Sequence, residues 1–245
     1  MKRFKMIVAY DGTHYNGFAK QPMGVTIQGT LNEAIAKIVQ HEVYTLGAGR
    51  TDRGVHAKGQ CCTFDSDTLI PAERLAKAIN SRLPEDITVK SVEEVSHTFH
   101  PRFGAKRKTY RYQILNAKIR DPFLYKYALL YPYNIDIELM RQAANEIVGT
   151  HDFACFCSAG STVKDTVRTV YSIDIRKEED LVTLDICGNG FLYNMVRIIV
   201  GTLLYVNEGK LAASDIRPII ESTDRTLAGP TAPAHGLTML NIEYQ

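Results

Sequence analysis

A single carboxylate lies in a glycine-rich stretch, residues 47–57, which reads GAGRTDRGVHA. Asp52 stands between Arg50 and Arg53, and glycines lie on both sides of this group. Because glycine permits tight turns, another molecule can approach such a backbone closely. Apolar residues lead into the stretch and out of it, so it is predicted to join two strands, where a scaffold often holds working residues. Asp52 is therefore the first candidate for a catalytic carboxylate, and an ordinary surface loop is the alternative.

A second segment, residues 102–111, combines basic and aromatic side chains without an acidic residue. Basic side chains contact phosphates and aromatic rings stack on bases, so this combination suits RNA. A solvated edge strand, in which lysine and arginine discourage aggregation, explains the charges equally well. The candidates for phosphate contact are Arg53, Arg102, Lys106, Arg107, Lys108 and Arg111. Further along the chain the basic run continues with Lys118, Arg120 and Lys126, and the first strand adds Lys2, Arg3 and Lys5 if it lies nearby.

An arginine in an apolar helix is the third unusual feature. Arg197 lies in a predicted helix that is apolar on nearly every side. A guanidinium there needs an acidic partner or several acceptors, unless its head reaches water. A salt bridge to Asp52 would satisfy both groups and would lower the pKa of the carboxyl. Such a pair would also tie together the two halves of the chain.

Two halves are predicted because the order strand, helix, strand, strand, helix, strand occurs twice. In the first half, residues 4–10 and 87–95 are the outer strands, Thr30 and Glu33 form a capping box for one helix, and Pro71 opens the other. The second half is predicted to have strands at 110–115, 167–176, 181–187 and 238–244, and helices at 135–148, 191–206 and 214–221. The sequence therefore predicts an α+β fold with domains at residues 1–104 and 105–245.

Composition narrows the chemistry further. The net charge of the 245 residues is only +2, so electrostatics must be considered locally. The five cysteines are odd in number and lack zinc spacings, so they are expected to be reduced, structural thiols. No phosphate-binding loop, dinucleotide fingerprint or nucleophile elbow is present, and we expect no metal and no cofactor. Without a membrane-spanning or signal-peptide pattern, a soluble cytoplasmic protein is expected.

Four histidines lack a plausible nucleophile nearby in the sequence: His56, His100, His151 and His235. We interpret them as structural residues that form hydrogen bonds.

The glycine-rich stretch closely resembles the signature of the tRNA pseudouridine synthase A family. Four further blocks resemble that family in its order: YDGT at 10–13, KTYRY at 108–112, GFLYNMVR at 190–197 and APAHGL at 232–237. The resemblance covers essentially the whole chain. It implies two ferredoxin-like, RRM-like halves with mainly antiparallel sheets that merge around a central catalytic cleft. It also places Asp52 as the catalytic carboxylate, Tyr110 as a tyrosine that stacks on the target base, and Arg197 as the partner of Asp52.

The family resemblance implies a reaction and a substrate. Uridine would be isomerised to pseudouridine in the anticodon stem-loop of tRNA, at positions 38, 39 and 40, by a homodimer in which each tRNA contacts both subunits. Asp52 could attack the sugar carbon, add to C6 of the base or remove a ribose proton, and sequence does not choose among these. Because a paired uridine is inaccessible, it must be flipped out, and we suggest that Arg50 helps to hold that state.

Two residues depart from the family pattern, and other functions stay open. Phe18 replaces a usual tryptophan and loses an indole N–H, while Arg53 stands where many members have alanine. The alternatives are a non-catalytic RNA-binding protein, a small-molecule lyase or hydrolase that uses Asp52 as a base, and a pseudouridine synthase acting on a different RNA.

Overall fold

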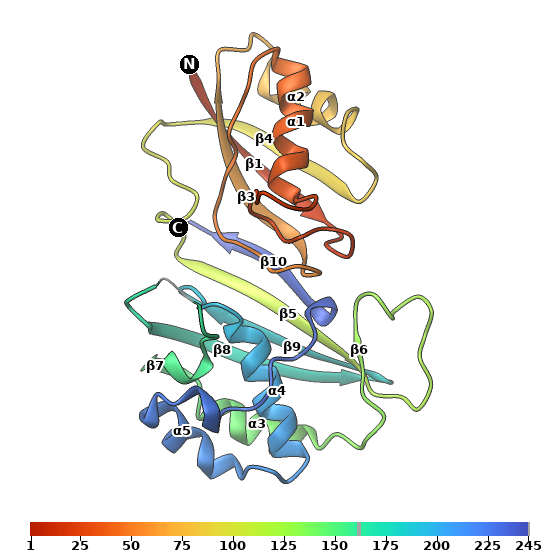
Figure 1. Cartoon of the computed structure of the whole chain (residues 1–245), viewed down its shortest axis with the longest axis vertical. Helices are drawn as coiled ribbons and strands as arrows, with labels where there is room; N and C mark the ends of the chain where they lie inside the picture. Colours follow the sequence, from red (N-terminus) through yellow and green to blue (C-terminus); the bar gives the residue numbers. More distant parts are fainter. Residues whose placement is uncertain (161–162, 245) are drawn as a thin grey trace. The chain divides into compact units, whose positions relative to one another are not determined.

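The protein, described here as a computed structural model of residues 1–160 and 163–244, consists of two compact units. The first contains Met1–Lys106 together with Thr238–Gln245, and the second contains Arg107–Leu237 (Figure 1). The predicted division after residue 104 assigned the final strand to the second half. That strand belongs instead to the first unit, because it pairs there with another strand.

The first unit follows the predicted element order. Its elements are β1 (Lys2–Tyr10), α1 (Ile27–Val39), β2 (Leu46–Gly47), β3 (His56–Ser66), α2 (Ala72–Asn80), β4 (Ile87–Val95) and, from the end of the chain, β10 (Leu237–Glu243). β1 lies between β4 and β3 and is antiparallel to both. β2 is antiparallel to β3, and β10 is parallel to β3 with Thr238 opposite His56.

Alternation along β1 creates the core of this unit. Phe4, Met6, Val8 and Tyr10 are buried in turn along the strand. Such period-two burial is what a strand with one covered face requires. Helices α1 and α2 contact each other and lie over the sheet (Figure 1). The residues that they bury completely are Leu31, Ile35, Leu75 and Ile79.

The start of α1 differs from the prediction. The helix begins at Ile27 and is capped by Thr26, whose side chain accepts a hydrogen bond from the Gly29 amide at 3.2 Å. Thr30, the predicted cap, lies inside the helix and donates its hydroxyl to the Thr26 carbonyl at 3.1 Å. The capping box at Thr30 and Glu33 is therefore wrong, because burial of Ile27 extends the helix by another turn.

The second unit also has a mainly antiparallel sheet. Its elements are β5 (Arg107–Leu115), β6 (Leu129–Leu130), α3 (Ile137–Asn145), β7 (Gly149–Asp152), β8 (Val167–Glu178), β9 (Leu181–Gly188), α4 (Met195–Asn207) and α5 (Ile216–Ser222). The strands are ordered β5, β9, β8, β7, and the short β6 is parallel to β5. Helix α3 contacts β8 and α4, and α4 contacts β5. The prediction of an α+β fold with mainly antiparallel sheets is confirmed, although β6 and β7 were not predicted.

Helix α4 is packed unusually closely by the segment at residues 229–233. A Cβ atom added to Gly201 would lie 1.8 Å from the Pro230 carbonyl oxygen, and one added to Gly229 would lie 2.6 Å from the Thr202 Cα. The Thr202 hydroxyl accepts a hydrogen bond from the Gly229 amide at 2.9 Å. This contact fixes residues 229–233 along the helix that carries Arg197.

Replacing Gly201 with alanine should therefore destabilise the protein. Glycine to alanine in a helix interior normally stabilises by up to about 1 kcal/mol. Here the added methyl group would overlap backbone, and overpacking of this kind costs about 1 to 3 kcal/mol. Urea denaturation of Gly201→Ala should show the loss. Gly29→Ala is the control, since its Cβ would meet only the Thr26 Oγ1 atom at 3.0 Å and should cost less. Equal stability of Gly201→Ala and the unaltered protein would contradict the close packing.

Candidate active site

The loop that carries Asp52 runs between β2 and β3 and ends in a tight turn. The Val55 amide donates to the Asp52 carbonyl at 3.1 Å, and Gly54 between them has a φ of 79°. That backbone conformation strains any residue with a side chain, so the glycine at position 54 is required. Asp52 is therefore the first residue of a β-turn, with a half-buried side chain, and Arg50 and Arg53 beside it are exposed.

Residues 10–18 hold this loop in place. The Tyr10 hydroxyl lies 2.8 Å from the Thr51 hydroxyl, and the Phe18 amide donates to the Thr51 carbonyl at 3.0 Å. A Cβ atom added to Gly12 would lie 2.0 Å from the Val55 carbonyl oxygen, and one added to Gly17 would lie 2.8 Å from the Thr51 carbonyl oxygen. Burial raises the pKa of Tyr10 well above its usual value, so this hydroxyl stays protonated. The backbone next to Asp52 is thus fixed by four residues from another part of the chain.

His56 holds the end of the same loop, as predicted for a structural histidine. Its Nδ1 atom lies 3.1 Å from the Gly12 amide nitrogen and 3.1 Å from Asp11 Oδ1. Asp11 in turn accepts a hydrogen bond from the Thr13 amide at 2.9 Å. His56 is the first residue of β3, and its ring therefore anchors that strand to the residues that follow β1.

Phe18 occupies the place of the expected tryptophan without leaving a gap. Its side chain is buried, and a Cβ atom added to Gly47 would lie 2.4 Å from its ring. The Tyr10 and Phe18 ring centroids are 6.4 Å apart. The first glycine of the motif is thus explained by close packing against an aromatic ring, and phenylalanine preserves that packing.

In the second unit, Tyr110 lies on β5 with its ring fixed by Phe191. The two ring centroids are 5.3 Å apart at an interplanar angle of 86°, which is the favoured edge-to-face arrangement. Tyr110 is opposite Ile186 in β9, and Phe191 belongs to the segment that leads into α4. The packing restricts rotation of the Tyr110 ring.

Arg197 is oriented by acceptors of its own unit. Its Nε donates to the Ala232 carbonyl at 2.7 Å and its Nη1 donates to Asn194 Oδ1 at 2.7 Å. Asn194 caps α4 in a left-handed conformation with a φ of 61°, and its side-chain amide donates to the Ser158 hydroxyl at 2.9 Å. The left-handed residue explains why α4 begins at Met195 and not at 191 as predicted. Sequence reasoning missed both Asn194 and the Ala232 carbonyl, since neither has a charge that would signal a role.

The structure separates the predicted phosphate-binding residues into two kinds. Arg111 forms a two-pronged ion pair with Asp185, with Nε to Oδ1 and Nη2 to Oδ2 distances of 2.7 Å. The carboxylate faces it from the neighbouring strand β9 and raises the pKa of Arg111. Although residues 102–111 contain no acidic residue, Arg111 therefore has an acidic partner on the neighbouring strand. In the first unit, Arg3 is bound by Asp65 in the same two-pronged way.

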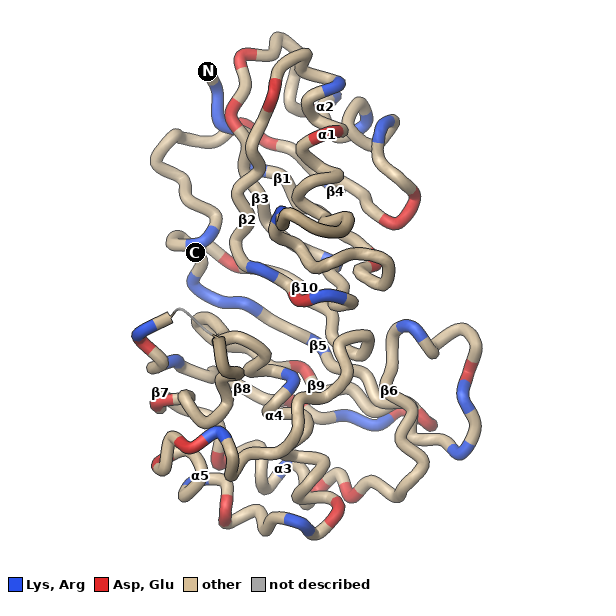
Figure 2. Tube along the Cα trace, in the orientation of Figure 1, with Lys and Arg blue, Asp and Glu red and all other residues tan. Residues whose placement is uncertain are grey.

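Other basic residues lie against aromatic rings. The Arg107 guanidinium is 4.8 Å from the centroid of the Tyr171 ring. Arg102 is 5.8 Å from the Phe103 ring, in a turn held by His100, whose Nδ1 accepts the amides of Arg102 and Phe103 at 3.1 Å. Lys106 and Arg107 are exposed, Lys108 is half-buried, and Figure 2 shows basic residues concentrated at the start of β5. A cation that lies on a ring keeps its full charge for an anionic ligand.

The chain is similar in sequence to known proteins over most of its length. A family model described as tRNA pseudouridine synthase matches residues 6–104 and 143–245. The chain belongs to this family. It is 47% identical over 245 residues to the tRNA pseudouridine synthase A of an Exiguobacterium species, covering 100% of this chain and 99% of the relative. Its identity to proteins of the same name from a Thermoanaerobacter species and from Brevibacillus brevis is 48% and 46%, with 100% of both chains covered.

Membership of the pseudouridine synthase family confirms the prediction of an isomerase. The family match includes the loop of Asp52 and the segment of Arg197, while residues 105–142, which carry Tyr110, lie between the two matched ranges. Asp52 belongs to the first unit, and Tyr110 and Arg197 belong to the second. The predicted ion pair between Asp52 and Arg197 stays a prediction.

No group of histidine, cysteine and acidic side chains suited to a metal ion occurs within residues 1–160 and 163–244. Over the same ranges, no helix is long and apolar enough to cross a membrane. The cysteines are free thiols, and burial raises the pKa of Cys155 to about 12.

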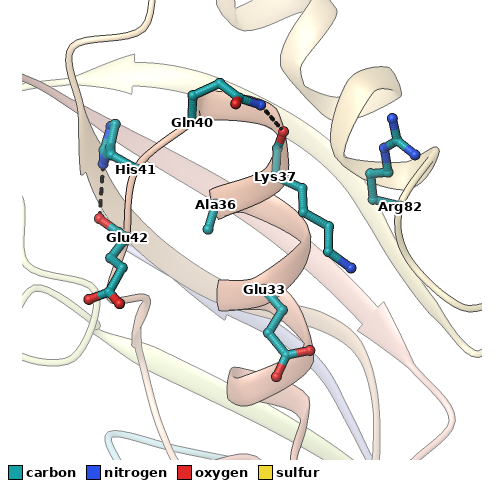
Figure 3. Close-up of a pocket in the computed structure, with 7 residues that line it drawn as sticks. All are labelled: Glu33, Ala36, Lys37, Gln40, His41, Glu42 and Arg82. Carbon is teal, nitrogen blue, oxygen red and sulfur yellow. Dashed lines mark hydrogen bonds between the residues drawn. The ribbon is translucent and has the colours of Figure 1, made fainter.

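A depression of about 680 Å³ lies beside α1 in the first unit. Figure 3 shows its lining, which mixes both signs of charge and consists of Glu33, Ala36, Lys37, Gln40, His41, Glu42 and Arg82. None of the predicted site residues lines it, so we do not assign it to the active site of this pseudouridine synthase family member.

The hydroxyl of Tyr10 should be required to hold the Asp52 loop. In Tyr10→Phe the buried Thr51 hydroxyl loses a partner, which should lower the free energy of unfolding by about 1 to 3 kcal/mol. Trypsin should then cleave faster after Arg50 and Arg53, because loosened loops are preferred cleavage sites. Tyr15→Phe is the matched control, since the buried Tyr15 donates to Asp86 at 2.6 Å and not to the loop. Equal cleavage of the loop in both variants would show that the Tyr10 hydroxyl does not hold it.

Proposed function

We propose that this protein isomerises uridine to pseudouridine in the anticodon stem-loop of tRNA, at positions 38, 39 and 40, with Asp52 as the catalytic carboxylate. The observation that carries the proposal is the location of Asp52: it opens a tight turn in the family's signature loop, and that turn is fixed by Tyr10, Gly12 and Phe18. A carboxylate held by its backbone in this way is positioned before substrate arrives, which favours catalysis.

The chemistry requires only one reactive group from the protein. The bond from N1 of uracil to C1′ of ribose breaks, the base rotates, and a bond forms from C5 to C1′ while the C5 proton leaves. Electrons and atoms balance without an oxidant or a second substrate. An ionised Asp52 begins the reaction by attacking C1′, by adding to C6 or by removing a ribose proton.

Arg197 is the proposed ionic partner of Asp52. Its guanidinium lies in the first turn of α4, which holds no acidic residue. The N-terminal end of a helix is electropositive, so a cation there favours a nearby anion. Ala232 and Asn194 orient the guanidinium but carry no net charge. A carboxylate that pairs with it would have a lowered pKa and would remain ionised at neutral pH.

Tyr110 and Arg50 are proposed to receive the flipped uridine. The edge-on contact with Phe191 supports a fixed orientation for the Tyr110 ring, against which a base can stack. Arg50 is exposed beside Asp52 and would hold the flipped state.

The tRNA backbone would be contacted by Arg53, Arg102, Lys106, Arg107 and Lys108. Arg111 is the weakest of the original candidates because Asp185 already binds it through two atoms. We further propose a cytoplasmic homodimer in which each tRNA contacts both subunits.

Asp52→Asn should abolish the reaction without abolishing tRNA binding. The measurement is release of tritium from tRNA transcripts labelled at C5 of uridine, because that hydrogen leaves only when the new carbon bond forms. Loss of one catalytic acid or base lowers the rate by about 10²-fold to 10⁴-fold. Asp180→Asn, at an exposed turn, is the control and should react normally.

Three other outcomes would correct the proposal. If the unaltered protein binds tRNA and releases no tritium, the protein is an RNA-binding platform. If Asp52→Asn reacts at the normal rate, another group starts the reaction. Release from transcripts labelled only outside the anticodon arm would show that the positions, and not the chemistry, are wrong.

Tyr110→Phe should slow tritium release while leaving tRNA affinity unchanged, if the hydroxyl assists loss of the C5 proton as we propose. The expected loss is about 10²-fold, as for other proton-transfer groups. Tyr110→Leu removes the ring as well and should weaken both release and binding of the flipped base. Full activity of the phenylalanine variant would exclude a role for the hydroxyl and leave stacking as the function of this residue.

A further inference from the structure

Several large apolar and aromatic side chains are exposed in the connection between β5 and α3. We define the aromatic loop as residues 116–133, which include β6 and read NAKIRDPFLYKYALLYPY. Phe123 is 86% exposed and Ile119 is 81% exposed, and Tyr125 and Tyr133 are also exposed. Exposed apolar groups that gather in one segment usually mark an interaction site.

The exposure is built into an ordered loop. Asp121 Oδ1 accepts the Phe123 amide at 2.7 Å, and the Asp121 carbonyl accepts the Tyr125 amide at 3.0 Å. At the other end, the Asn116 side-chain amide donates to the carbonyls of Tyr131 and Tyr133 at 2.9 and 2.7 Å. These hydrogen bonds fix the backbone, so Phe123 and Tyr125 are presented outward by the fold itself.

The charges of the loop identify its partner. Lys118, Arg120 and Lys126 are its basic residues, and Asp121 is its single acidic residue. The Asp121 carboxylate is already used by the turn that it stabilises. Lys118 and Arg120 are exposed, and Lys126 lies 5.8 Å from the centroid of the Tyr125 ring. Cations interleaved with aromatic faces complement a polyanion that also offers flat bases, which is single-stranded RNA.

A second copy of the chain is a weaker fit to the same loop. The centres of protein interfaces are depleted of lysine, whereas here two lysines and an arginine flank the aromatic residues. The loop lies between the two ranges matched by the family model and so belongs to neither of the segments that carry Asp52 and Arg197.

We propose that the aromatic loop is a tRNA-contacting surface, in which Phe123 and Tyr125 stack on unpaired bases while Lys118 and Arg120 contact the neighbouring phosphates. This inference rests on the proposed function, in that it takes tRNA as the substrate. It concerns binding and not the chemical step.

The test separates stacking from charge with two double variants of the full chain. Phe123→Ala with Tyr125→Ala removes the rings, and Lys118→Gln with Arg120→Gln removes the charges. Their controls are Tyr44→Ala with Leu69→Ala, which are exposed apolar residues of the first unit, and Lys37→Gln with Arg82→Gln, which line the depression of Figure 3. Binding of a fluorescently labelled tRNA is measured over a range of salt concentrations, and oligomeric state by sedimentation.

Loss of the rings should weaken tRNA binding at least about 5-fold, with little change in its salt dependence. Loss of the charges should reduce the slope of log affinity against log salt by about 1 to 2. At subsaturating protein, both variants should release tritium from C5-labelled tRNA more slowly, and a higher protein concentration should reduce that deficit. Both control variants should bind as the unaltered protein does.

The inference is overturned if the ring variant binds tRNA as tightly as its control, or if it changes the sedimentation of the protein alone, since the loop would then join two copies. Failure of the proposed function gives a different result. In that case the unaltered protein releases no tritium, and the loop is judged on binding alone. If the unaltered protein does not bind tRNA, both proposals are wrong.

Discussion

The close packing of residues 10–18 against the loop of Asp52 is the constraint on which the rest of the site depends. Gly12 and Gly17 let two stretches of backbone approach to distances at which no side chain fits. Only then can the Tyr10 hydroxyl reach Thr51, a residue 41 positions away in the chain. The position of the carboxylate is therefore set by the folded sheet that brings these segments together, and not by the loop alone. Gly12, Gly17 and, in the motif itself, Gly47 serve this packing, so their role is structural even where the chemistry lies next to them.

In the second unit, close backbone contacts position Arg197 in the same way. Gly201 and Gly229 let residues 229–233 lie directly against α4, and this places the Ala232 carbonyl at the guanidinium. The Asn194 side chain fixes the other side. These two acceptors are uncharged groups that orient the guanidinium. In each unit, close contact of backbone thus fixes the segment that carries a charged residue of the candidate site.

Much of the fold was predictable because the signals are local. Alternation along β1 and β9, the apolar stripe of α2 and the strand at β4 all follow from residue periodicity and are confirmed. The errors arise where distant contacts decide. Thr26 and Thr30 are both possible caps, and burial of Ile27 selects the first. The pairing of β10 with β3 joins residues far apart in the chain, and β6, with two residues, is too short to have a periodicity.

For the candidate site, sequence identified the charged residues but not their partners. It grouped Arg107 and Arg111 together because they share one basic segment. The sheet separates them: Arg111 faces Asp185 on the next strand, while Arg107 lies on the ring of Tyr171. A phosphate must compete with a two-pronged carboxylate for the first, because that ion pair already satisfies the guanidinium geometry. At Arg107 the neighbouring group is the aromatic ring of Tyr171, which does not compete with a phosphate as a carboxylate does. The net charge of only +2 therefore does not describe the local electrostatics, because Arg107 packs on a ring while Arg111 is paired with a carboxylate.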